Sequence, residues 1–276
     1  MKFNPSFRET AVRLARIAAN EVNRSLHQPY AQERKADRSL VTDVDRRVDE
    51  ILREGLVKAF PGHTILTEES GLSGPKDSEY VWMIDPLDGT RAFVKGIPGF
   101  SVMVGLLHQR RPILGVVVDP MEERLYEAMR GEGAFQTYQG KREQIRVSTR
   151  DRFDEMPLIV STGFPEEKMK RFRESFYGPL ATPINSVGIK VGLVVRQVAD
   201  IYLSHHSVHY WDTCAPQAIL EEAGGMFTRL DGTALQYDLA EGFSHEALTL
   251  ATNGQRHADC VRIFSSGVYP KLFDPQ

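Results

Sequence analysis

The stretch WMIDPLDGTRAF, residues 82–93, constrains the fold of this 276-residue chain more than any other. Its three leading apolar residues are typical of the end of a buried strand. Pro86 fixes its own φ and has no N–H to donate to a strand ladder, and Asp88-Gly89 is a common turn pair. A strand that ends in a turn explains one aspartate. A second one, Asp85, is harder to explain, because two close carboxylates repel each other unless a positive charge lies between them.

The composition excludes several classes of protein. A hydrophobic fraction of 41% and a charged fraction of 26% are typical of a globular protein. The formal net charge of -3 gives no overall basic surface, so we expect no nucleic-acid polymer as a partner. The first twenty residues lack a signal-peptide core and no apolar run approaches a membrane span, so we expect no membrane partner. Cys214 and Cys260 form no disulfide framework, which predicts a cytoplasmic location.

Apolar periodicity predicts a helix pair followed by strands in the first half of the chain. One helical face recurs from Phe7 to Val22, with a capping box over residues 6–9, and Phe60-Pro61-Gly62 ends a second helix. That second helix is predicted over residues 43–59, followed by a strand over 64–67 and a loop over 71–78. Further strands are predicted over residues 101–107, 113–118 and 125–129, with a hairpin strand after them.

The second half of the chain alternates strands and helices. Strands are predicted over residues 158–161, 200–204, 226–230 and 247–252, and helices near residues 166–176, 187–198 and 213–223. The pattern changes over residues 148–157. We therefore predict two parts, a helix pair with a mainly antiparallel sheet over residues 1–147 and an α/β subdomain over residues 148–276.

Acidic residues recur at the ends of these predicted elements. Hard cations such as Mg²⁺ prefer oxygen ligands and bind through a few carboxylates while keeping waters for a substrate phosphate. Each acidic residue taken alone is better explained as a helix cap or a surface charge. Taken together, the set favours a metal site, and its members are Glu68, Asp85, Asp88 and Asp212.

Four motifs carry a resemblance to a known superfamily: T-D-V-D at residues 42–45, T-E-E-S at 67–70, W-M-I-D-P-L-D-G-T at 82–90, and W-D-T-C-A-P at 211–216. The chain resembles the Mg²⁺-dependent, lithium-sensitive phosphatases, which include inositol monophosphatases, fructose-1,6-bisphosphatases and CysQ-like 3'(2'),5'-bisphosphate nucleotidases. The resemblance implies an α/β (α+β) fold, a five-layered α-β-α-β-α sandwich, in a monomer or homodimer.

The resemblance also implies a site for two or three Mg²⁺ ions. The implied metal ligands are Glu68, Asp85, the Leu87 carbonyl, Asp88 and Asp212, with Asp85 shared between two ions. The implied catalytic residues, which activate and orient a water, are Asp45, Glu68 and Thr90, and the resemblance implies a hydrogen bond between Asp45 and Thr90. The predicted substrate-binding residues are Gly89, Thr90, Ser186, Gly188, Lys190 and Asp212. Most metal ligands thus fall in residues 1–147, and Asp212 and the specificity residues in 148–276.

Lys190 decides the substrate that we expect. In the bisphosphate nucleotidases a lysine in this region meets the second phosphate of the substrate, whereas a solvated surface lysine is the alternative. The expected reaction is therefore hydrolysis of 3'-phosphoadenosine 5'-phosphate to AMP and phosphate. The alternatives are an inositol-1-monophosphatase or other sugar-phosphate phosphatase, fructose-1,6-bisphosphatase included, and a catalytically silent phosphate-binding protein. The histidines of H-H-S-V-H, residues 205–209, favour a surface or substrate-rim loop over a zinc site.

Overall fold

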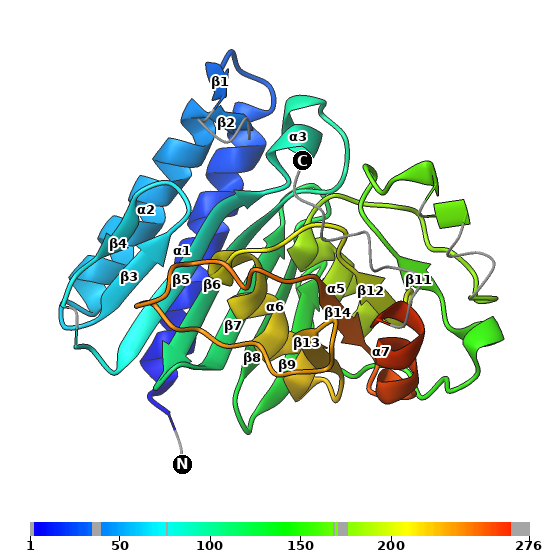
Figure 1. Cartoon of the computed structure of the whole chain (residues 1–276). Coiled ribbons are helices and arrows are strands. Elements are labelled where there is room, and N and C mark those ends of the chain that lie inside the picture. Colours follow the sequence, from blue (N-terminus) through cyan, green and yellow to red (C-terminus); the bar gives the residue numbers. More distant parts are fainter. Residues whose placement is uncertain (1–2, 35–39, 76, 168, 171–175, 266–276) are drawn as a thin grey trace.

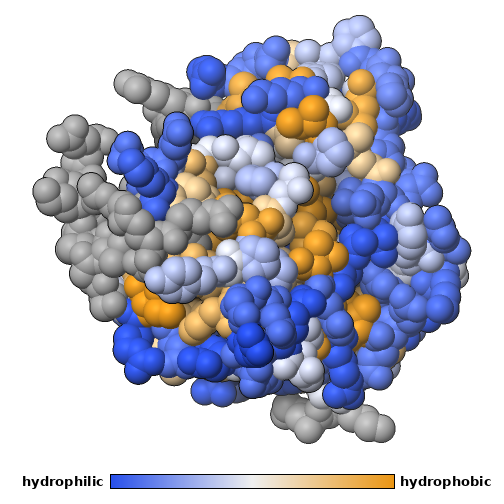
Figure 2. Space-filling view, turned by 90° about the vertical axis from the view of Figure 1, so that its right-hand side faces the viewer, coloured by the Kyte–Doolittle hydropathy of each residue, from blue (hydrophilic) through white to orange (hydrophobic). Residues whose placement is uncertain are grey.

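The computed structural model describes residues 3–34, 40–75, 77–167, 169–170 and 176–265. They form the predicted five-layered sandwich, which runs from the α1–α2 layer at the left of Figure 1 to α7 (His257–Ser265) at the right. The face shown in Figure 2 is hydrophilic around its edges and has apolar residues gathered toward its centre. In the described residues, no helix is long and apolar enough to cross a membrane.

The outer helical layer consists of α1 (Pro5–Ser25) and α2 (Asp43–Ala59). Helix α2 has the predicted bounds, and a capping box between Thr42 and Asp45 begins it. The capping box predicted at Ser6 is wrong, because the side chain of Asn4 caps α1 by accepting a hydrogen bond from the backbone N–H of Ser6. These two helices cover one face of a large sheet.

The large sheet has eight strands in the order β10-β9-β8-β7-β6-β5-β3-β4. Only the β3–β5 pair among its described strands is parallel. Strand β4 lies within the stretch predicted as a loop over residues 71–78, so that prediction is wrong for its first three residues. The strands are β3 (Thr64–Thr67), β4 (Gly71–Ser73), β5 (Tyr80–Asp88), β6 (Ser101–His108), β7 (Arg111–Asp119), β8 (Arg124–Met129), β9 (Gly133–Tyr138) and β10 (Lys141–Ile145).

Two helices, α5 (Val187–Val195) and α6 (Tyr210–Glu222), lie between the large sheet and a four-stranded sheet in the order β11-β12-β14-β13. Helix α6 begins three residues before the predicted start, and α5 ends three residues before the predicted end. The helix predicted near residues 166–176 falls largely outside the described residues. The strands of the small sheet are β11 (Leu158–Ile159), β12 (Ile201–Leu203), β13 (Met226–Arg229) and β14 (Thr249–Thr252). The remaining elements are β1 (Gln32–Arg34), β2 (Leu40–Thr42), α3 (Thr90–Val94) and a 3₁₀ turn, η1 (Phe153–Glu155).

Helix α6 packs unusually close to the large sheet. A Cβ atom on Gly115 of β7 would lie 2.2 Å from the carbonyl oxygen of Ala215, and one on Gly105 of β6 would lie 2.6 Å from Sγ of Cys214. Only glycine therefore permits this approach of helix to strands. The contact fixes the height of α6 over the sheet and with it the position of Asp212 in its first turn.

The core between the large sheet and α5–α6 draws on both halves of the chain. Met103 and Val117 of the sheet pack in one cluster with Val191 of α5 and Ile219 of α6. The division of the chain near residues 148–157 therefore does not divide this core, and two parts over residues 1–147 and 148–276 stay a prediction. Both cysteines are buried and free.

Candidate active site

Several elements end around one cavity of about 380 Å³. Glu68 follows β3, Asp85 and Asp88 lie at the end of β5, Thr90 begins α3, and Asp212 lies in the first turn of α6. The structure thus brings together residues that are up to 144 positions apart in the sequence. The predicted site residues on the cavity wall are Glu68, Asp85, Leu87, Asp88, Gly89, Thr90, Lys190 and Asp212.

A bulge in β5 sets the directions of its two aspartates. Opposite β6, Asp85 pairs with Met103 and Asp88 pairs with Ser101, so three steps along β5 face two along β6. The strand therefore continues past Pro86, where the sequence had predicted a simple end of the ladder. Within the bulge, the Leu87 N–H donates a hydrogen bond to Oδ1 of Asp85 (3.1 Å).

Gly89 follows the bulge in a left-handed conformation, with φ of 91° and ψ of 33°. A Cβ atom at this position would lie 2.3 Å from the carbonyl oxygen of Gly99. Both the φ value and this contact exclude other residue types. The turn directs the chain into α3, so the backbone of Gly89 and Thr90 lies on the cavity wall beside the aspartates.

Asp88 is held by the N-terminus of α5. Its Oδ2 accepts hydrogen bonds from Oγ of Ser186 (2.6 Å), the N–H of Gly188 (2.9 Å) and Oγ of Ser101 (3.3 Å). Ser186 and Gly188 had been predicted to line the substrate. They lie behind Asp88 instead, and the cavity is lined by their neighbours Asn185, Val187 and Lys190.

Gly188 has a further steric reason to be glycine. A Cβ atom there would lie 2.6 Å from Oγ of Ser101 and 2.7 Å from Sδ of Met103. The missing side chain lets the start of α5 approach β6 closely enough for its N–H to reach Asp88. The sequence showed a glycine in a helix, but not the strand that the helix packs against.

Asp45 and Thr90 lie together, as the resemblance implied. Oγ1 of Thr90 donates to Oδ1 of Asp45 (3.1 Å) and also lies 3.1 Å from the carbonyl oxygen of Leu87. The other carboxylate oxygen of Asp45 accepts hydrogen bonds from the N–H and Oγ1 of Thr42. Burial raises the pKa of Asp45 to about 6, against the lowering effect of these hydrogen bonds.

The carboxylates around the cavity disfavour one another's charge. Burial, and then the charges of Glu68, Asp88 and Asp212, raise the pKa of Asp85 well above its usual range. Burial, and then the charge of Asp212, raise the pKa of Asp88 to about 6. Both shifts have the sign expected where a positive charge is needed to keep the carboxylates ionised.

The donor atoms suit a hard divalent cation. The hydrogen bonds described for the three aspartates use Oδ1 of Asp85, Oδ2 of Asp88 and Oδ2 of Asp212, which accepts from the His209 N–H (2.7 Å). The second oxygen of each aspartate is in no hydrogen bond within the described part of the chain, so it is free to bind a cation. Among the described residues no three His, Cys, Asp or Glu side chains form a preformed metal site. The free carboxylate oxygens fit an ion such as Mg²⁺, which prefers oxygen donors and keeps several water ligands.

Lys190 is buried, with only 1% of its surface exposed, which excludes the solvated surface lysine. Its Nζ donates hydrogen bonds to Oγ of Ser161 (2.7 Å) and the carbonyl oxygen of Asn185 (3.1 Å), and lies 4.6 Å from the ring centroid of Tyr202. Burial lowers the pKa of Lys190 to about 8, and the charges of Asp88 and Asp212 oppose this shift. The ammonium group thus lies at the boundary between the acidic wall and the rest of the cavity.

The cavity wall also contains residues that the sequence did not assign to substrate. Ser161 and Asn185 belong to this wall, together with Arg91, His205 and His206. Asn185 and Ser161 carried only the weak signal of small polar residues after a strand and before a helix. The two histidines line the cavity. This position is compatible with the surface or substrate-rim loop that the sequence favoured.

The model of the "Inositol monophosphatase family" matches residues 4–264 of this chain. The chain belongs to the inositol monophosphatase family. It is 34% identical over 233 residues to the Nus factor SuhB of Pasteurella multocida, covering 80% of this chain and 84% of that relative. It is 33% identical over 205 residues to a fructose-1,6-bisphosphatase/inositol-1-monophosphatase of Aquifex aeolicus, covering 71% of this chain and 74% of that protein.

Solved structures of this family have the same architecture. The inositol monophosphatase of Anabaena (Nostoc) superposes with a TM-score of 0.76 at 27% identity, covering 95% of this chain and 96% of that one. Membership of the inositol monophosphatase family makes this chain a phosphatase of that superfamily. None of the relatives named here is called a bisphosphate nucleotidase.

Proposed function

We propose that this chain is a Mg²⁺-dependent phosphomonoesterase that hydrolyses a polyol or sugar monophosphate such as inositol-1-phosphate. One observation carries the proposal: the hydrogen-bonded pair of Asp45 and Thr90 lies at the edge of a cavity with four carboxylates. The names of the Aquifex and Anabaena relatives support the polyol over the nucleotide that the sequence had favoured.

The metal sites proposed here follow the oxygen donors of the cavity. Glu68, Asp85 and the Leu87 carbonyl would hold one Mg²⁺ ion, while Asp85, Asp88 and Asp212 would hold a second; a third would lie near Glu68. Bound there, the ions supply a polarised water and neutralise charge on the phosphate oxygens. The protein keeps these ligands in place through α5, which holds Asp88, and through the His209 N–H, which holds Asp212.

Asp45 and Thr90 would orient the attacking water. When Thr90 Oγ1 donates its hydrogen to Asp45, its lone pairs remain free to accept a hydrogen bond from that water. The raised pKa of Asp45 suits a group that takes up proton density during the reaction. Glu68 lies on the same wall and would assist removal of the proton, and the backbone amides of Gly89 and Thr90 would bind the phosphate oxygens.

A second candidate substrate is 3'-phosphoadenosine 5'-phosphate. The observation that favours it is the cationic part of the wall, where Arg91 and the buried Lys190 face the same cavity as the carboxylates. A second phosphate on the leaving group would meet this positive charge. An inositol ring would instead be held by the hydroxyl and amide groups of Ser161 and Asn185.

A panel of substrates tests both candidates. Phosphate release would be measured in excess Mg²⁺ from inositol-1-phosphate, fructose-1,6-bisphosphate and 3'-phosphoadenosine 5'-phosphate. We expect the highest kcat/KM for inositol-1-phosphate, and an Asp88→Asn variant that is inactive toward all three. The highest value for the nucleotide would select the second candidate, and no release from any of them would overturn the proposal of catalysis in favour of a phosphate-binding protein.

The other predicted partners stay predictions. A homodimer or monomer remains the expected assembly. The Pasteurella relative carries the name Nus factor. The expectation that this chain binds no nucleic-acid polymer therefore has no support from its relatives.

A further inference from the structure

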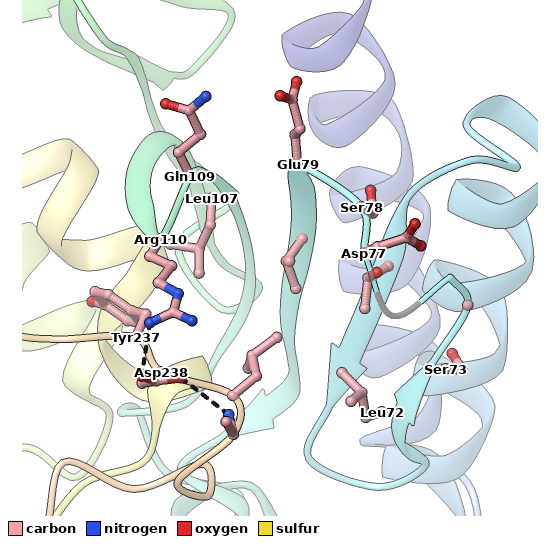
Figure 3. Close-up of a pocket in the computed structure, with 15 residues that line it drawn as sticks. Leu72, Ser73, Asp77, Ser78, Glu79, Leu107, Gln109, Arg110, Tyr237 and Asp238 are labelled. Carbon is pink, nitrogen blue, oxygen red and sulfur yellow. Dashed lines mark hydrogen bonds and ion pairs between the residues drawn. The ribbon is translucent and has the colours of Figure 1, made fainter.

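A second cavity, of about 600 Å³, lies at the opposite end of β5 from the candidate active site (Figure 3). Its wall includes Val81, whereas the active-site cavity includes Asp88 of the same strand. Seven residues of extended chain separate these positions by roughly 23 Å. The two cavities share no lining residue, so an occupant of one does not touch the other.

The floor of this cavity is formed by three neighbouring strands of the large sheet, whose side chains there are at most 9% exposed. Thr64, Val81 and Leu107 lie side by side on β3, β5 and β6, because Val81 is the register partner of both of the others. They occupy the face that α6 covers elsewhere in the sheet. Here the segment after β13 lies over this face, and Tyr237 and Leu239 of that segment form an apolar wall.

The charges around this floor are mostly negative. Arg110 is already neutralised, because its Nη1 lies 2.7 Å from Oδ2 of Asp238, and Figure 3 shows its side chain directed toward that carboxylate. Within the described part of the chain, Asp77 has no hydrogen-bond or ion-pair partner. Oε2 of Glu79 lies 3.9 Å from Nε2 of His108, an imidazole that carries a charge only when it is protonated. Among the described residues, Asp77 thus has no cation close to it, and Glu79 has only an imidazole.

A strained turn holds one side of the cavity. Gln109 and Arg110 join β6 to β7 with φ values of 49° and 63°, a conformation that residues other than glycine and asparagine rarely adopt. The Gln109 N–H donates to the carbonyl oxygen of Glu79 (3.0 Å), which ties this turn to the residue before the neighbouring strand β5. The turn thus presents Arg110 to Asp238.

We propose that this cavity binds a small amphipathic cation, an apolar body that carries a protonated amine. The volume lies in the range of small-molecule sites, and the floor would bury the apolar body. Asp77 and Glu79 would meet the ammonium group at the mouth. A carboxylate or phosphate ligand finds no free cation among the described lining residues, since Arg110 is paired with Asp238.

Three probes with one shared body test the charge preference: 4-phenylbutylammonium, 4-phenylbutanol and 4-phenylbutyrate. Each would be titrated into the full-length protein in excess Mg²⁺, which blocks cation binding at the carboxylates of the active site. Affinities and contact positions would be followed by ¹H–¹⁵N chemical-shift changes, with the amides of Val81 and Leu107 as reporters. We expect the ammonium probe to bind at least about tenfold more tightly than the carboxylate, with the alcohol between them.

Two variants locate the site. Ala240→Trp places a large side chain at the exposed rim of the cavity and should abolish binding, whereas Gln236→Trp, on the same segment but off the wall, should leave it unchanged. The double variant Asp77→Asn, Glu79→Gln should bind the ammonium and alcohol probes equally. Equal binding of all three probes to the original protein, no binding at millimolar concentration, or full binding by Ala240→Trp would each overturn the proposal.

Discussion

The hydroxyl of Thr90 lies 3.1 Å from Oδ1 of Asp45, although 45 residues separate the two in the sequence. Asp45 has a second task, since its Oδ2 completes the capping box that begins α2. One carboxylate therefore joins the start of a structural helix to the turn of the candidate active site. This arrangement predicts that changes at Thr90 and Asp45 will affect the protein differently.

Replacement of Thr90 by alanine should lower kcat by about 10²- to 10⁴-fold, the range expected when a group that assists proton transfer is lost. Stability should change little, because Asp45 keeps its bonds to Thr42. Thr90→Ser retains the hydroxyl and should keep most of the activity. The checks are phosphate release under saturating substrate and Mg²⁺ binding by calorimetry, and a Thr90→Ala variant with more than half the original kcat would refute the role of this pair.

Asp85→Asn should stabilise the metal-free protein while abolishing its response to Mg²⁺. An asparagine still accepts the hydrogen bond of the Leu87 N–H but carries no charge to repel Glu68, Asp88 and Asp212. In EDTA we expect a free energy of unfolding about 1 kcal/mol higher than that of the original protein. Added Mg²⁺ should raise the Tm of the original protein only.

Urea unfolding measures the free energy and thermal unfolding measures the Tm, each with and without Mg²⁺. Asp154→Asn is a matched control, because Asp154 forms an exposed ion pair with Arg152 far from the cavity. It should leave the Mg²⁺ response intact. A metal-dependent rise in Tm that persists in Asp85→Asn would contradict the assignment of Asp85 to both ions.

Lys190→Met should increase the KM for any anionic substrate by about tenfold, because it removes a buried positive charge from the cavity wall. Methionine has a similar length and keeps the packing against Tyr202, but leaves the Ser161 hydroxyl and the Asn185 carbonyl without their partner. If the nucleotide is the substrate, its KM should increase more than that of inositol-1-phosphate. Steady-state kinetics on both compounds would show this difference, and equal KM values in variant and original would remove Lys190 from substrate binding.

His245 should make the protein less stable as the pH falls below neutrality. Burial lowers the pKa of His245 to about 4, from 6.5 in an unfolded chain. Between these values the unfolded state binds more protons, so the free energy of unfolding falls as the pH decreases from 6.5 and levels off near 4. The loss attributable to this residue is about 3 kcal/mol at the lower end.

Urea titrations from pH 4 to 7 would measure this slope, with His245→Gln as the comparison. Glutamine can still hydrogen-bond Oγ1 of Thr213, which lies 2.7 Å from Nε2 of His245, but it does not titrate. The variant should be less stable at pH 7 yet have a shallower slope below pH 6.5. Parallel curves for the two proteins would show that another group causes the pH dependence.

The sequence predicted elements with a strong local signal. Helix α2 was correct at both ends because its apolar face and Phe60-Pro61-Gly62 agree. Thr90 and Asp45 were paired through the resemblance alone, since no local pattern connects residues that meet only after the sheet and α2 have packed. Strand β4 was missed because a three-residue edge strand in a glycine-rich stretch has no periodicity to detect.

The residues that hold the carboxylates in place were harder to predict from the sequence than the carboxylates themselves. Acidic residues after strands are visible in the sequence, whereas the use of Ser186 and Gly188 to hold Asp88 depends on how close α5 lies to β6. The bulge at Pro86 depends likewise on register with a neighbouring strand. Tertiary contacts thus decide which residues line the cavity and which residues support that lining from behind.

Tyr237 contacts both the second cavity and helix α6, and this double role limits which substitutions the chain can accept. Its ring is a wall of the second cavity, while its hydroxyl lies 2.7 Å from Oε1 of Gln217 and 3.0 Å from Oγ1 of Thr213, the neighbour of Asp212. A substitution that reshapes the second cavity at this residue therefore also removes hydrogen bonds from the helix that carries Asp212. Selection on either cavity limits the changes that the other can accept, so the segment around Tyr237 should evolve more slowly than its place in a surface loop implies.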